Sequence, residues 1–194
     1  QISERAFRQE ILAEFIEGGG GVFRRVTEAA IATPQDRARE GAQYVFGVDW
    51  GRSGDFTVIA VFDITAGELV HLDRFTQVGY DIQLGRLRAL CDRFHPVSII
   101  AEANSMGGPL TEALQRMALP VRPFTTTNAT KAAIIDALAL GFERGDLRII
   151  NDPVLVAELQ AYEMERLPSG LLRYSAPDGL HDDCVMGLAL AWHG

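Results

Sequence analysis

The sequence is poor in features that mark several common protein classes. Its 194 residues include only two cysteines, and no apolar run approaches the roughly 20 residues of a membrane span. The two thiols, Cys91 and Cys184, suit a reducing compartment, form no metal-ligand pattern and are expected in the core. No basic-then-apolar leader opens the chain, which argues against a secretion signal. Residue 1 is Gln, as in a chain that begins inside a longer protein.

Short nucleotide-binding and catalytic motifs are missing as well. The sequence has no Gly-x-x-x-x-Gly-Lys-Ser/Thr, so it carries no phosphate-binding loop for ATP. It also lacks Gly-x-Gly-x-x-Gly, Gly-x-Ser-x-Gly and any Cys/His zinc pattern. His71, His95 and His193 have no metal-site spacing and are expected to be structural. Any catalytic or binding site in this chain must therefore be built from residues outside these motifs.

Positive charge is scarce relative to negative charge. Eighteen basic residues face 26 acidic ones, which gives a net charge of −8. Taken alone, this balance disfavours a nucleic-acid partner. The objection weakens if several carboxylates bind cations, because bound cations change the local field. Lys131 is the only lysine; the arginine bias would suit phosphate contacts, but we attribute it first to genome composition.

The chain divides into two segments of different character. Residues 1–17 carry apolar residues at helical spacing, and Gly18 to Gly21 then form a flexible joint. Residues 1–40 are predicted to be a linker or docking segment. Residues 41–194 are long enough for one domain with its own core.

A regular pattern of short apolar runs begins at residue 44. Strands at 44–49, 56–63 and 68–75 predict an antiparallel meander. Further strands are predicted at 97–101, 120–123, 147–150 and 171–174, and helices at 81–94, 108–118, 128–143, 153–162 and 182–193. This order predicts an α/β fold with a mixed central sheet covered by helices on both faces.

Carboxylates flank three of the apolar segments. Asp49 closes one predicted strand, Glu102 closes another, and the pair Asp182-Asp183 opens the last helix. A carboxylate at the end of a buried strand lies at the rim of the sheet, where sites are usually built. Three converging carboxylates would repel one another unless a cation lay between them. Oxygen ligands favour Mg²⁺ or Mn²⁺, so the pattern predicts a divalent metal site.

Each acid also has an ordinary structural explanation. Asp49 has the context of a turn residue, Glu102 that of an exposed strand end, and Asp182-Asp183 that of a helix cap with an acidic first turn. Asp55 would lie beside Asp49 and could reach the same ion, although Ser-Gly-Asp is also a common hairpin tip. The metal prediction therefore depends on the acids coming together.

Two further side chains are candidates for a supporting role. His181 would be a surface residue, a proton carrier or a neighbour of a metal ligand. Lys131 opens a predicted helix, where a positive charge is unfavourable. A role toward a DNA phosphate or the leaving group would explain Lys131, and a solvated surface lysine is the equal alternative. The small polar stretch 103–108 leaves room for a phosphate near Glu102.

The order of the acidic clusters resembles that of the ribonuclease H-like superfamily. Four local sequences narrow the resemblance to the nuclease domain of the large terminase subunit of tailed bacteriophages: Gly47-Val48-Asp49-Trp50-Gly51, Glu102-Ala103-Asn104, Thr130-Lys131 and His181-Asp182-Asp183. The opening segment, from Phe7 to Phe23, is similar to the stretch that joins the ATPase and nuclease domains of that family. The resemblance thus covers nearly the whole chain.

The resemblance implies a metal-dependent endonuclease that cuts concatemeric viral DNA during genome packaging. It implies catalytic roles for Asp49, Glu102 and Asp183, and metal binding by these three and Asp182. It does not distinguish the two adjacent aspartates, and we favour Asp183 as the ligand. We expect two Mg²⁺ or Mn²⁺ ions and hydrolysis by the two-metal route.

The resemblance also implies partners and rivals. Expected partners are double-stranded DNA, an ATPase domain of the same full-length chain, the portal and the small terminase subunit, in the cytoplasm of an infected bacterial host. DNA contacts are expected from Lys131, Arg52, Arg166 and Arg173. A junction resolvase or transposase-type nuclease is the enzyme alternative, and its need for a basic face or a dimer interface fits poorly with a charge of −8. A catalytically silent motor interaction domain is the other alternative.

Overall fold

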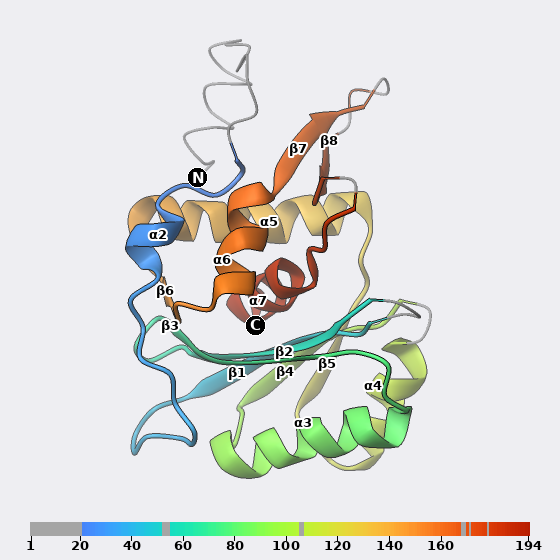
Figure 1. The fold of residues 1–194 in the computed structure, drawn as a ribbon. Coiled ribbons are helices and arrows are strands. Elements are labelled where there is room, and N and C mark those ends of the chain that lie inside the picture. The colour runs from blue at the N-terminus through green and yellow to red at the C-terminus, as the bar shows by residue number, and fades with distance from the viewer. Residues whose placement is uncertain (1–20, 52–54, 105–106, 168–169, 171, 178) are drawn as a thin grey trace.

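The computed structural model describes residues 21–51, 55–104, 107–167, 170, 172–177 and 179–194. In Figure 1 a central sheet lies between a lower layer of helices α3 and α4 and an upper layer of helices α5, α6 and α7. The predicted helix at 1–17, the glycines at 18–20 and Arg52 lie outside the described residues.

The meander predicted from the sequence forms the centre of the sheet. Its strands are β1 (Tyr44–Asp49), β2 (Thr57–Asp63) and β3 (Glu68–Phe75), paired antiparallel. Three more strands are parallel to their neighbours: β4 (Ser98–Glu102) beside β1, β5 (Val121–Phe124) beside β4, and β6 (Arg148–Ile149) beside β3. The strand order is β5-β4-β1-β2-β3-β6. The expected mixed sheet of an RNase H-like α/β fold is thereby confirmed.

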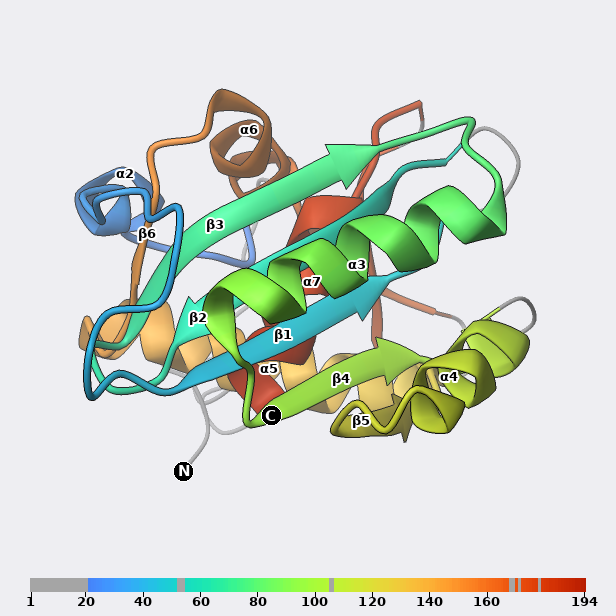
Figure 2. The ribbon, with the colours of Figure 1, turned by 90° about the horizontal axis from the view of Figure 1, so that it is seen from below.

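Helices cover both faces of this sheet, as Figure 2 shows from below. The helices are α2 (Val26–Ala29), α3 (Tyr80–Phe94), α4 (Gly107–Arg116), α5 (Asn128–Arg144), α6 (Pro153–Ala161) and α7 (Asp183–His193). Thr127 caps α5 and accepts a hydrogen bond from the amide of Thr130, and Gly145 ends that helix in the left-handed conformation. None of the helices in the described ranges is long and apolar enough to cross a membrane.

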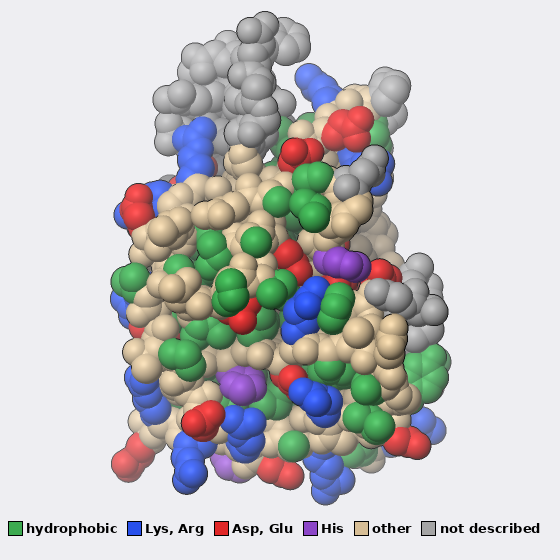
Figure 3. Space-filling view, viewed as in Figure 1, with side chains coloured by type: hydrophobic (Ala, Val, Ile, Leu, Met, Phe, Trp, Pro, Cys, Tyr) green, Lys and Arg blue, Asp and Glu red, His purple; other side chains and the backbone are tan. Residues whose placement is uncertain are grey.

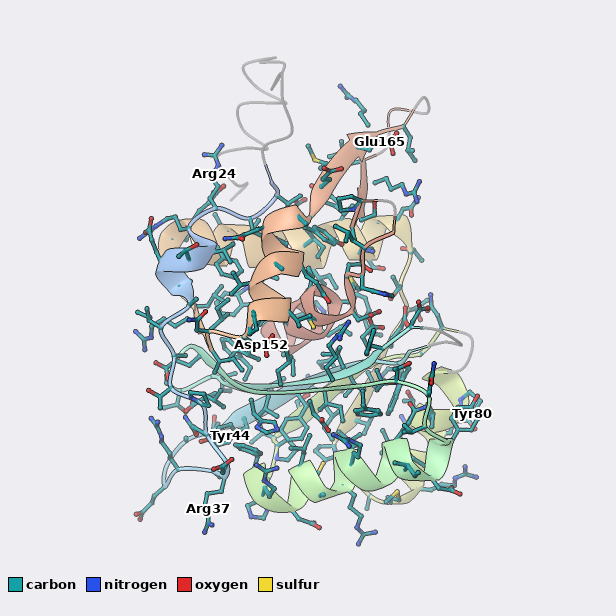
Figure 4. All side chains as sticks on the ribbon, in the orientation of Figure 1. Arg24, Arg37, Tyr44, Tyr80, Asp152 and Glu165 are labelled. Atoms are coloured by element: carbon teal, nitrogen blue, oxygen red, sulfur yellow. The ribbon has the colours of Figure 1, made fainter. Side chains whose placement is uncertain are left out.

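The sheet separates two apolar clusters. The first lies under α5, α6 and α7 and includes Leu138, Phe142, Leu159 and most of α7. The second lies between the sheet and helices α3 and α4, where Tyr44, labelled in Figure 4, packs edge-on against Phe94. Because both faces of β1 and β2 are buried, these strands read as continuous apolar runs rather than as alternating ones. Cys91 and Cys184 are buried, as expected from their isolation.

The described part of the segment before residue 41 packs on the domain. Val22, Phe23 and Val26 belong to the upper apolar cluster, where Phe23 contacts the rings of Phe142 and Tyr162. Residues 21–40 therefore contribute to the fold, and the division at residue 40 stays a prediction.

A short hairpin stands above the upper helical layer. Strands β7 (Glu163–Arg166) and β8 (Leu172–Ser175) pair antiparallel outside the main sheet. In Figure 4 Glu165 marks this hairpin as the element that projects away from the sheet.

Candidate functional site

Three elements bring their carboxylates toward one edge of the sheet. Asp49 is the last residue of β1, and Glu102 is the last residue of the parallel neighbour β4. Val48 is in register with Ala101, so the two acids follow side by side at the same edge. Asp183 begins α7, which packs across β1 and β2. The three acids therefore start from neighbouring ends of β1, β4 and α7, and their grouping into a metal site stays a prediction.

Close backbone contact between β1 and α7 makes this convergence feasible. A Cβ atom added to Gly47 would overlap the carbonyl oxygen of Gly187 and the amide nitrogen of Ala191. A Cβ added to Gly187 would lie 2.8 Å from a methyl carbon of Val58. Glycine at these two positions lets the helix lie against the sheet, and the helix N-terminus then lies near the end of β1.

The electrostatics show that the acids act on one another. Burial raises the pKa of the Asp49 carboxyl well above its ordinary value, and the charges of Glu102, Asp183 and Asp182 raise it further. Lys131 opposes this shift. Burial also raises the pKa of Asp183.

Lys131 supplies a cation within the protein itself. Its Nζ lies 2.9 Å from Oδ2 of Asp182 and donates a hydrogen bond to it, and the lysine side chain is only 22% exposed. The ammonium also lies 5.8 Å from the ring centroid of Tyr162. The interpretation of Lys131 as a solvated surface residue is therefore wrong, because its charge is directed into the acidic cluster.

The Asp183 carboxylate has other contacts than the Asp182 carboxylate. Its Oδ2 accepts a hydrogen bond of 3.3 Å from the amide of Phe56, the residue before β2. Nδ1 of His181 lies 3.6 Å from the same oxygen, and the His181 ring meets the Phe56 ring edge-on. Asp182 and Asp183 thus have different neighbours, which their adjacency in sequence did not reveal.

The donor set suits a divalent ion in its chemistry, since carboxylate oxygens are the ligands that Mg²⁺ and Mn²⁺ prefer. In the arrangement described, however, no group of three or more His, Cys, Asp or Glu side chains within the described ranges is spaced to hold a metal ion. Asp182 is paired with Lys131 instead.

The other described residues predicted to support the site or to contact DNA lie on the exposed surface. Asp55 is exposed, and its charge is the smallest of the named influences on the pKa of Asp183. Arg166 and Arg173 are exposed on the projecting hairpin, where Arg173 is opposite Glu165. On the face drawn in Figure 3, basic and acidic side chains are interspersed. No continuous basic patch is drawn among the described residues on this face.

Two residues of this region were missed by the sequence analysis. Glu158, on α6, accepts a 2.8 Å hydrogen bond from the amide of Cys184 at the start of α7. Tyr162 is buried, and burial together with the nearby charges of Asp182 and Asp49 raises its pKa. The signal for Glu158 was an acid between Leu155 and Leu159 on the buried stripe of a helix.

Comparison with known proteins identifies relatives of the same kind. The sequence is 30% identical over 201 residues to the large terminase subunit of Thermus virus P23-45, covering 98% of this chain and 41% of that protein. The chain therefore spans less than half the length of this relative. No family model matches the sequence.

Solved structures agree with the sequence comparison. The large terminase nuclease from the thermophilic phage G20c superposes with a TM-score of 0.81 and 28% identity, covering 90% of this chain and 98% of that one. The same nuclease with bound magnesium also gives a TM-score of 0.81, at 28% identity over 90% of this chain and 97% of that one. Over nearly its whole length, the chain is thus similar in sequence and fold to the nuclease domain of phage large terminase subunits, as its acidic motifs predicted.

Proposed function

We propose that this domain is a divalent-metal-dependent endonuclease that hydrolyses phosphodiester bonds of double-stranded DNA. The observation that carries the proposal is the placement of Asp49, Glu102 and Asp183, from three separate elements, near enough that the charges of the other two add to the effect of burial in raising the pKa of Asp49. The similarity to a large terminase nuclease, whose structures include magnesium-bound and cobalt-bound forms, supports it.

Each carboxylate has a role that its position suggests. Asp49 interacts with all three of the other acids, which suits it to be shared between two ions. Glu102 and Asp183 would each complete the surroundings of one ion, and Asp182 would join them once released from Lys131. Two divalent ions bound there would activate the attacking water and stabilise the leaving 3′ oxygen. No side chain need act as the nucleophile.

Lys131 has two successive tasks in this proposal. Without metal its ammonium offsets part of the negative charge of the cluster through Asp182. Once ions are bound, the same ammonium would be free to contact a phosphate oxygen of the scissile strand. His181, 43% exposed and close to Asp183, is placed to accept or donate a proton at the solvent side of the cluster.

The wider biological role is also a proposal. In a full-length protein, an ATPase domain of the same chain would move the DNA, and this domain would cut concatemeric DNA during genome packaging. The length difference from the Thermus virus relative leaves room for such a domain. The portal and the small terminase subunit would be further partners, in the cytoplasm of the infected host.

A plasmid-nicking assay tests the activity directly. Supercoiled plasmid incubated with the domain and Mn²⁺ should be converted to open-circular and linear forms, and EDTA should stop the conversion. Absence of nicking by the metal-loaded protein at any concentration would favour the silent interaction domain. Cleavage confined to four-way junctions would favour the resolvase alternative.

Metal ions should raise the melting temperature of the domain. An ion that binds only the folded state stabilises it by about 2.7 kcal/mol at a hundredfold excess over its dissociation constant. For a domain of this size, that corresponds to a rise of about 5–10 °C. Because sites with few carboxylates bind Mg²⁺ weakly, millimolar metal is needed. Thermal denaturation with increasing Mg²⁺ or Mn²⁺ measures the shift, and an Asp49→Asn variant serves as the control that should lose it. A flat response in the wild-type protein would contradict the site.

Nicking by the isolated domain should be slow, largely sequence-independent and sensitive to salt. If about three phosphates are contacted, the affinity should fall about 40-fold between 50 and 200 mM salt. Arg173→Gln, on the exposed hairpin, should reduce the slope of log affinity against log salt by about 1. Arg88→Gln, exposed on α3 across the sheet, removes the same charge and should leave the slope unchanged. Fluorescence anisotropy with duplex DNA measures both, and tight binding that is insensitive to salt would contradict the expectation.

A further inference from the structure

The N-terminus of α7 is capped by a residue from another helix. Asp182 occupies the N-cap position, yet its side chain makes no capping hydrogen bond. A capping side chain ordinarily accepts from the amides of the second and third helical residues. In α7 those amides belong to Cys184 and Val185, and both donate to Oε2 of Glu158, at 2.8 and 3.4 Å.

Glu158 is held in this place by its burial and by the two hydrogen bonds from α7. It lies on α6, is 8% exposed and sits among the apolar residues of the upper cluster. Its other oxygen, Oε1, lies 4.0 Å from Nε of Arg74 on β3. The Arg74 guanidinium in turn stacks on the ring of Phe56, 3.2 Å from its centroid. Since the amide of Phe56 donates to Asp183, the contacts form a closed chain around the start of α7.

This arrangement changes what Asp182 can do. Aspartate is among the best N-cap residues, so an uncapped α7 would draw the Asp182 carboxylate back onto its own helix. With Glu158 supplying the acceptor, the Asp182 carboxylate instead points to Lys131, 51 positions away in sequence. Both adjacent aspartates then remain directed at the cluster that contains Asp49.

The choice of a carboxylate for this cap has a physical reason. Burying a charge beside other acids is costly, and a neutral cap would avoid that cost. Two charge-assisted hydrogen bonds and the positive end of the helix dipole offset it. The amides of Cys184 and Val185 bind a charged carboxylate more strongly than a neutral acceptor. A charged Glu158 therefore keeps these amides occupied, so that the Asp182 side chain does not bind them.

We propose that Glu158 is a positioning residue of the metal centre: by capping α7 from α6, it keeps the side chains of Asp182 and Asp183 available as ligands. This inference rests on the proposed metal-dependent nuclease function. Glu158 itself contacts neither the ions nor the DNA in this proposal, and it acts through the amides of α7.

Three variants test the proposal in the metal-bound protein. Glu158→Leu removes the acceptor, Glu158→Gln keeps a neutral acceptor of the same shape, and Glu40→Gln removes an exposed charge as the control. Outer-shell changes at metal sites typically cost about 10-fold to 100-fold in affinity or activity. We expect that loss of Mn²⁺ affinity in Glu158→Leu by calorimetry, a smaller loss in Glu158→Gln, and none in Glu40→Gln. Nicking should show a lower kcat with little change in KM for DNA.

A readout without metal separates this inference from the proposed function. Crystal structures of the metal-free Glu158→Gln and Glu158→Leu variants provide it. In the leucine variant the Asp182 side chain should turn toward the amides of its own helix and lose contact with Lys131. If Asp182 stays on Lys131 and Mn²⁺ affinity is unchanged in both variants, Glu158 only stabilises the fold and the proposal is wrong. If the wild-type protein binds no metal, the proposed function fails, while the position of Asp182 in these structures still decides whether Glu158 directs it.

Discussion

Replacing Asp49 by Asn should abolish DNA nicking while leaving the metal-free domain folded and at least as stable as the wild type. Asp49 is the acid on which the other three act, so it is the ligand whose loss should disturb every bound ion. Changes to residues that merely support metal ligands cost about 10-fold to 100-fold, and loss of a shared ligand should exceed that range. Plasmid nicking under Mn²⁺ measures the loss.

The metal-free stability of the Asp49→Asn variant is expected to hold for a separate reason. Burial and three neighbouring acids raise the pKa of Asp49, so its charged form is unfavourable in the metal-free fold. A neutral side chain of the same shape removes that repulsion, and the melting temperature without metal should hold or rise. Asp146→Asn, at an exposed turn after α5, is the matched control and should nick normally. A folded Asp49→Asn protein that nicks at the wild-type rate would sink the assignment of the site.

The sheet and its acidic rim could be predicted because the signals are local. Buried strands read as apolar runs, and an acid at the end of each run marks the rim. Helix α3 connects β3 to β4, and the pairing of β4 with β1, which brings Glu102 beside Asp49, is known only from the structure. The sequence could therefore predict the mixed sheet and the acids at the strand ends, but not which strands are neighbours.

The different contacts of Asp182 and Asp183 could not be predicted from the sequence. Asp-Asp before an apolar helix predicts a local cap, and that prediction is wrong for Asp182 because Glu158 takes the amides. The partner of Asp182 is Lys131, in another helix. Contacts between residues far apart in sequence depend on how α5, α6 and α7 pack together, which no local pattern specifies.

The segment before the domain shows the same limit. The residues that follow Gly21 have a mixed and charged composition, which favoured a linker. Val22, Phe23 and Val26 nevertheless pack into the upper cluster because the surface between α5 and α6 offers them apolar partners. Burial of a few isolated side chains becomes visible only when that surface is known.

Replacing Gly47 by Ala should destabilise the domain more than any other single added methyl group considered in this fold. The new Cβ would overlap the backbone of α7 at Gly187 and Ala191, and backbone atoms cannot turn aside as a side chain can. Overpacking of this kind costs typically 1–3 kcal/mol and occasionally more, and we expect about 3 kcal/mol here. The melting temperature should fall by about 6–12 °C.

The same variant tests how the metal centre is built. If α7 is pushed away from β1, Asp183 moves away from Asp49, so the stabilisation by Mn²⁺ should shrink as well as the metal-free stability. Gly85→Ala is the matched control, because no atom lies within 4 Å of the added Cβ in the middle of α3. Alanine is the better helix former there and should raise stability by about 0.5–1 kcal/mol. A Gly47→Ala protein as stable as the wild type, with an unchanged response to Mn²⁺, would mean that α7 does not rest on β1 at this point. The close approach of glycine backbones would then no longer explain how an acid on a helix meets two acids on strands.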